Sequence, residues 1–141
     1  MKDITLKITG KQYFKDMEEE QMEFVTEGKL YQRNGAVYVV YEESEISGMD
    51  GCKTTLRLKD DTVRMKRTGM SGYGSELYFE KGKRFTGVYS TPFGDMSIEV
   101  LTSAVSSYIN AEEGTGRVDV SYDVSMEGVA EGKNQITIDI I

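Results

Sequence analysis

Apolar and polar residues alternate along most of this 141-residue chain, and this period of two constrains its fold more than any other feature. Three apolar side chains alternate with polar ones in residues 4–8, and the pattern recurs at 55–59, 96–100, 118–124 and 136–140. Successive side chains on a strand point to opposite faces, so the pattern predicts strands with one buried and one wet face. The best helix candidate, residues 13–22, has a poor apolar stripe. It is interpreted as a strand end, an acidic turn and the start of the next strand.

Short turn sequences interrupt the alternation. Asn34-Gly35 is the strongest hairpin signal, because both central residues of a type I′ turn need positive φ. Other breaks fall at Asp60-Asp61, 81–83, 112–114 and 127–128. The loops are too short for the helical crossovers that parallel strands need. Meander order and hairpin-sized loops favour a barrel over a sandwich. We therefore predict one all-β domain over residues 1–141, an antiparallel up-and-down β-barrel of about eight to ten strands.

Length and charge bound the class of protein. A chain of 141 residues buries about two thirds of its unfolded surface, enough for one core. Acidic residues outnumber basic ones by 24 to 17, which disfavours nucleic acid and anionic membranes. The alternating start lacks the apolar stretch of a signal peptide, and no apolar run approaches the roughly 18 residues of a membrane helix. Cys52 alone permits no internal disulfide, which fits a reducing compartment. We expect a cytoplasmic protein, and the oligomeric state stays open.

The single proline, Pro92, lies within the sequence YSTPFG. Proline has no N–H for a strand ladder, so it should lie between strands. A type I turn prefers proline in its second position and glycine in its fourth, as here. We therefore expect a corner between strands at 83–90 and 95–101, with Phe93 folding over an open barrel end. A ligand contact from Tyr89 or Phe93 is the alternative.

Five short motifs resemble recurring landmarks of the YwiB-like family of small bacterial proteins. They are YEESE followed by Gly48 at 41–48, KRTG at 66–69, FEKGK at 79–83, YSTPFG at 89–94, and the segment at 112–123. Together they cover essentially the whole chain in the expected order. The resemblance implies a calycin- or lipocalin-like β-barrel. It brings no established activity, substrate or catalytic residues.

The residue types exclude several chemistries. The chain has no histidine, which excludes Ser-His-Asp and Cys-His nucleophilic systems and histidine-ligated zinc. The segment GMSGYG has its glycines in the wrong order for a dinucleotide fingerprint and is interpreted as a bend. Consecutive strand residues point to opposite faces, so Glu18-Glu19-Glu20 cannot all ligate one ion. Cys52 is expected to be a small core residue. We expect no metal, no cofactor and no defined catalytic residue.

One group of residues is a candidate site. Arg67 falls in phase with Val63 and Met65, which predicts that its guanidinium points into the barrel. If Val37 and Val39 face inward, Tyr41 and Glu43 face inward too, because they continue the same alternation. A buried charge needs a partner, so an internal Arg67–Glu43 pair is one interpretation. The other is that Arg67 binds a ligand carboxylate or phosphate. The candidate ligand-binding residues are Arg67, Glu43, Tyr41, Tyr89 and Phe93.

The predicted barrel and its interior polar residues suggest two functions, and a third ranks below them. The first is a barrel that binds a small amphipathic or anionic ligand in its interior. The second is a filled barrel whose surface binds a protein partner, without a ligand. Enzyme activity ranks third, because no carboxylate pair or metal singles out an acid or a base.

Overall fold

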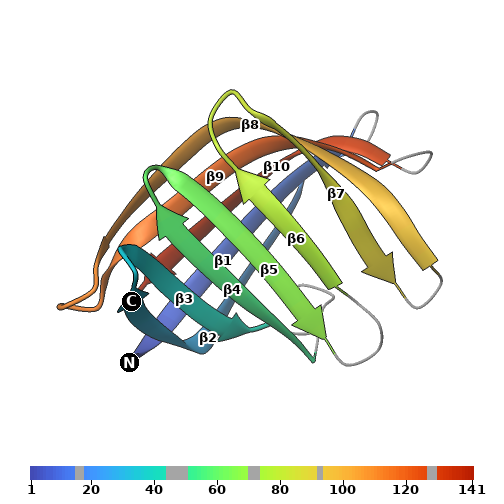
Figure 1. The fold of residues 1–141 in the computed structure, drawn as a ribbon. Helices are drawn as coiled ribbons and strands as arrows, with labels where there is room; N and C mark the ends of the chain where they lie inside the picture. The colour runs from blue at the N-terminus through green and yellow to red at the C-terminus, as the bar shows by residue number, and fades with distance from the viewer. Residues whose placement is uncertain (15–17, 44–50, 70–73, 92–93, 127–129) are drawn as a thin grey trace.

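The structure, a computed structural model, describes residues 1–14, 18–43, 51–69, 74–91, 94–126 and 130–141. Ten strands in these ranges form one closed antiparallel barrel, in which each strand pairs with the next and β10 pairs with β1 (Figure 1). They are β1 (Lys2–Phe14), β2 (Glu20–Arg33), β3 (Ala36–Glu42), β4 (Cys52–Lys59), β5 (Thr62–Gly69), β6 (Gly74–Phe79), β7 (Arg84–Thr91), β8 (Gly94–Asn110), β9 (Thr115–Met126) and β10 (Ala130–Ile140). The predicted antiparallel up-and-down barrel is confirmed. Its kinship with calycins or lipocalins stays a prediction, as does the single domain.

The barrel interior is filled with apolar side chains. On β1 the expected face is buried, with Ile4, Leu6 and Ile8 at 6%, 0% and 2% exposure. Buried aliphatic and aromatic residues from the other strands meet them in one continuous core. The largest fully buried side chains include Tyr41, Phe79, Leu30, Leu56 and Met65. The middle of the barrel is therefore packed like an ordinary protein core.

Strand β8 is longer than the sequence pattern predicts. The expected strand at 95–101 continues to Asn110, and a register shift lies between Thr102 and Ala104 where β8 pairs with β9. A β-bulge inserts one unpaired residue and reverses the inside–outside phase beyond it. The alternation that ends near Leu101 therefore resumes beyond the bulge in the opposite phase. In this new phase Val105 and Ile109 face inward and pack against the core. This break in phase hid the second half of the strand.

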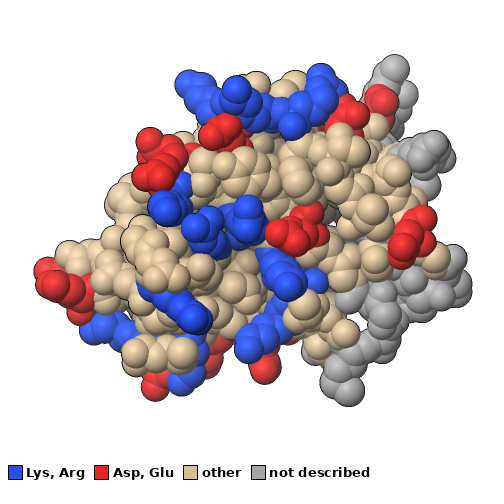
Figure 2. All heavy atoms as spheres, viewed as in Figure 1, with Lys and Arg blue, Asp and Glu red and all other residues tan. Residues whose placement is uncertain are grey.

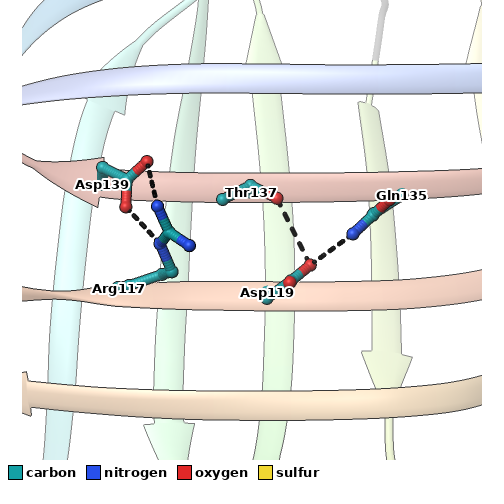
Figure 3. Close-up of polar contacts among 5 residues, drawn as sticks. All are labelled: Arg117, Asp119, Gln135, Thr137 and Asp139. Carbon is teal, nitrogen blue, oxygen red and sulfur yellow. Dashed lines mark hydrogen bonds and ion pairs between the residues drawn. The ribbon is translucent and has the colours of Figure 1, made fainter.

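Polar side chains on the outer face pair across strands (Figure 3). Arg117 Nε and Nη2 donate to the two carboxylate oxygens of Asp139, at 2.5 and 3.3 Å. Asp119 accepts hydrogen bonds from Gln135 Nε2 at 3.1 Å and from Thr137 Oγ1 at 3.3 Å. Figure 2 shows basic and acidic side chains close together on another part of the surface. Exposed pairs of this kind contribute about 1 kcal/mol or less each.

The described parts of the chain contain no helix long and apolar enough to cross a membrane.

The predicted corner around Pro92 lies between two described strands, because β7 ends at Thr91 and Thr91 pairs with Gly94 of β8. Pro92 and Phe93 themselves lie outside the described residues, so the predicted position of the Phe93 ring stays a prediction.

Two hairpins use the same backbone conformation with different residues. Asn34 and Gly35 have φ of 52° and 77°, as a type I′ turn requires. Asp60 and Asp61 connect β4 to β5 with φ of 51° and 60°. Glycine adopts positive φ without cost, whereas aspartate tolerates it with some strain. The hairpins therefore differ at the second central position, where Asp61 carries strain that Gly35 avoids.

Exchanging the residue types at these hairpins should change stability in opposite directions. Gly35→Ala should lower the free energy of unfolding by about 1 kcal/mol through backbone strain alone, since no atom lies within 4 Å of the added methyl group. Asp61→Gly should raise it by about 0.5 kcal/mol by relieving strain. Urea unfolding of both variants tests this. A loss of stability in Asp61→Gly would contradict it.

Candidate functional site

A row of polar residues lies inside the barrel across four neighbouring strands. Tyr41, Thr54, Arg67 and Ser75 stand directly opposite one another, on β3, β4, β5 and β6 respectively. Residues paired in this way share one face of the sheet. Tyr41, Thr54 and Ser75 are buried. The Arg67 side chain is 16% exposed, so it faces the interior, as its phase predicts.

Glu43 joins this row from the end of β3. Its backbone N–H donates to the carbonyl of Cys52 at 2.9 Å, which keeps the chain beside β4. Its carboxylate accepts a 2.6 Å hydrogen bond from Thr54 Oγ1, and 2% of the side chain is exposed. Arg67 Nε lies 3.6 Å from Glu43 Oε1. This distance allows an ion pair but exceeds that of a hydrogen bond.

Electrostatics hold Tyr41 neutral and Arg67 charged. Burial, reinforced by the negative charge of Glu43, raises the pKa of the Tyr41 phenol far above its usual range. Burial alone would lower the pKa of Arg67, but its interactions with Tyr41 and Glu43 outweigh burial and raise that pKa. The cluster therefore combines a guanidinium, a carboxylate and a neutral phenol in a nearly dry environment.

The other two predicted site residues are placed less completely. Tyr89 lies on β7 opposite Ser75, which itself pairs with Arg67, so Tyr89 is two strands away from Arg67 around the barrel. Its side chain lies outside the described residues, as does Phe93. The structure therefore brings Tyr41, Glu43 and Arg67 together and leaves these two aromatic candidates as predictions.

A second polar row, missed by the sequence analysis, lies on β8, β9 and β10. Thr102 and Asn134 flank Tyr122 in register. Thr102 and Tyr122 are 1% and 6% exposed, and the Tyr122 ring packs on Phe79 with centroids 4.7 Å apart. Asn134 could have been found, because it is in phase with the isoleucines at the end of β10. Thr102 could have been found too, because it is in phase with Ile98 and Val100 before the bulge, but the predicted strand ended one residue short of it.

Three buried polar atoms of these two rows have no hydrogen-bond partner among the described residues: Arg67 Nε, Thr102 Oγ1 and Asn134 Oδ1. Leaving a buried donor or acceptor unpaired costs about 1–3 kcal/mol, and more for a charged group. In the described part of the chain, no group of three or more acidic or cysteine side chains is arranged to hold a metal ion. The interior thus offers hydrogen bonds and charge, which suit recognition of a polar molecule.

These features define a meander β-barrel protein with a charged cluster inside it. The chain belongs to the family described as "Domain of unknown function (DUF1934)", whose model matches residues 6–138. It is 26% identical over 123 residues to the "Uncharacterized beta-barrel protein YwiB" of Bacillus subtilis, covering 87% of this chain and 82% of that protein. The resemblance to YwiB-like proteins is confirmed.

A solved structure matches the fold. The crystal structure of the ywiB protein from Bacillus subtilis superposes with a TM-score of 0.75 and 22% sequence identity, covering 99% of this chain and 93% of that chain. At this identity the likeness shows the fold alone.

Two arginines of β5 give a matched test of what burial does to an ion pair. Arg64 and Arg67 each place Nε 3.6 Å from a glutamate oxygen, of Glu76 outside and Glu43 inside. Arg67→Met should lower the free energy of unfolding by about 3–5 kcal/mol, because it leaves a buried carboxylate unpaired. Arg64→Met should cost about 1 kcal/mol or less. Equal losses in urea unfolding would contradict this assignment.

The buried tyrosines predict a loss of stability at alkaline pH. The pKa of Tyr41 and of Tyr122 is raised in the folded protein, chiefly by burial. Their contribution is complete below the unfolded pKa of about 10 and is lost as pH rises toward the folded values. The free energy of unfolding should therefore fall above about pH 10. Tyr41→Phe should make that fall shallower, and the exposed Tyr13→Phe should not. Urea unfolding at several pH values measures both slopes.

Proposed function

We propose that this protein binds a small anionic ligand at the interior charged cluster, with Arg67 holding the anion. The unpartnered Nε–H of Arg67 carries the proposal, because a cationic donor without a hydrogen bond is a costly group to bury. Glu43 lies too far from Nε to satisfy it, and its Oε1 already accepts the Thr54 hydroxyl. An incoming carboxylate or phosphate oxygen would supply the missing acceptor.

The ligand is compact. Fully buried side chains such as Leu6, Leu56 and Met65 occupy the middle of the barrel. A long apolar tail would have to displace them, at a cost of several kcal/mol for a well-packed core. The apolar side chains of the interior therefore belong to the packed core and are not free to line a pocket for an amphipathic molecule. Only the side chains of the two polar rows remain to bind a ligand. This favours a ligand of a few heavy atoms over a lipid.

A filled barrel that binds a protein partner is the second candidate. The dense core favours it, as do four large apolar or aromatic side chains that lie within described strands and are 51–65% exposed. These are Tyr13, Val25, Val88 and Tyr108. They belong to four different strands, β1, β2, β7 and β8. Exposed hydrophobic residues scattered singly are normal on soluble proteins, so this candidate is the weaker one.

Oxyanion binding to variants of the two arginines tests the proposal. Propionate and inorganic phosphate should raise the melting temperature of the protein, and calorimetry should give a dissociation constant for at least one of them. Arg67→Lys keeps a positive charge beside Glu43 and so should fold, but it lacks the planar fork of donors. It should weaken binding at least about tenfold, which is the loss expected for one charge-assisted hydrogen bond.

Arg64→Met is the matched control, since it removes a guanidinium from the outer face of the same strand. It should bind both probes like the unaltered protein. Weakening in Arg64→Met equal to that in Arg67→Lys would indicate nonspecific attraction to surface charge. Failure of both anions to bind the unaltered protein would overturn the proposal in favour of the filled barrel.

A further inference from the structure

The second polar row faces the charged cluster across the barrel interior. Tyr122, on β9, interacts electrostatically with Arg67 of β5, and the positive charge of Arg67 partly offsets the effect of burial on the Tyr122 pKa. Thr102 and Asn134 lie on either side of Tyr122 in the sheet. The Tyr122 ring also packs on Phe79 of β6, with ring centroids 4.7 Å apart, so the second row faces the wall formed by β5 and β6, which carries Arg67.

The backbone holds this second wall in place. The carbonyl of Thr102 accepts the N–H of Gly82 at 2.9 Å, and its N–H donates to the carbonyl of Lys83 at 3.3 Å. The turn between β6 and β7 thus fixes the backbone of β8 at Thr102, whose hydroxyl is buried. Asn134 is held through its side chain, whose hydrogen bond to Tyr122 leaves Oδ1 unpartnered. A fixed donor–acceptor pair of this kind is preorganised for a ligand.

We infer that Thr102 and Asn134 are the second half of the binding site, and that its ligand is a short oxyanion carrying a hydroxyl or N–H group. The inference rests on the proposed function, because Arg67 must hold the anionic group. Asn134 Oδ1 can only accept a hydrogen bond, whereas the Thr102 hydroxyl can donate or accept one. A ligand hydroxyl or N–H can donate to either oxygen, and a plain alkyl group would leave both unpartnered.

Matched pairs of probes that differ by hydroxyl groups test this chemistry. Lactate is compared with propionate, and glycerol 3-phosphate with propyl phosphate, so that carboxylate and phosphate sources of the anion are distinguished. Calorimetry on the intact protein should show that the hydroxylated member binds about tenfold more tightly in at least one pair. Octanoate serves as the long-chain probe and should bind no better than propionate.

Thr102→Val is the decisive variant, since it preserves shape and removes the hydroxyl. It should abolish the preference for the hydroxylated probe while leaving the affinity for its plain partner within about twofold. Because the hydroxyl is unpartnered, the melting temperature should not fall. Thr86→Val, at an exposed position of β7, is the control and should keep the preference. Asn134→Leu provides a second test should Thr102→Val fold poorly.

The possible results separate this inference from the proposed function. Equal affinities within both pairs, or a preference that survives in folded Thr102→Val, would overturn the inference. If Thr102→Val does not fold, a preference that survives in Asn134→Leu would overturn it instead. If Arg67→Lys still weakened binding in that case, the proposed function would stand. Tighter binding of octanoate than of lactate would also overturn the inference, because it would indicate a lipid-like ligand. Failure of every probe to bind the unaltered protein would overturn both.

Discussion

Removal of water from the barrel interior is the constraint on which the rest of this structure depends. Closure leaves a space that the inward-facing half of every strand must fill, and apolar side chains fill most of it. Any polar atom placed there loses its hydration and needs a partner inside. Thr54 and Glu43 satisfy each other at 2.6 Å, and the charge of Arg67 is balanced by Glu43. The atoms that stay unpartnered lie in two polar rows, on β5 and on β8–β10, and the proposed ligand site rests on them.

Much of this could be predicted from the alternation in the sequence. A period of two specifies strands, and phase placed Arg67 on the inner face, whereas for Tyr41 and Glu43 it predicted this only on the condition that Val37 and Val39 face inward. Phase cannot give distance, so the choice between a sealed ion pair and a ligand site needed the geometry. That geometry shows an ion pair in which Glu43 balances the charge of Arg67 without accepting a hydrogen bond from Nε, and the ligand site stays a proposal.

The parts that the sequence could not predict share a physical cause. A bulge shifts the strand register by one residue without any characteristic residue type in the sequence. The sequence therefore could not predict which side chains of β8 face inward beyond Thr102. The Asp60-Asp61 hairpin was recognised as a break, but its positive φ values at both positions were not expected of residues other than glycine. Interior polar residues on β8–β10 became visible as a group only through the register that aligns them around the barrel.

Closure of the barrel joins strands from the two ends of the chain, and this has a consequence for biosynthesis. Pairing of β1 with β10 runs from Leu6 opposite Ile140 to Phe14 opposite Gly132. During translation β1 emerges first and must wait for nearly the whole chain before its second neighbour exists. Until then β1 and β9 each present an unpaired edge, a template for pairing with other nascent chains. Charged residues on β1 and β10, such as Lys7, Lys11 and Asp139, are well placed to discourage that pairing until β10 has been synthesised.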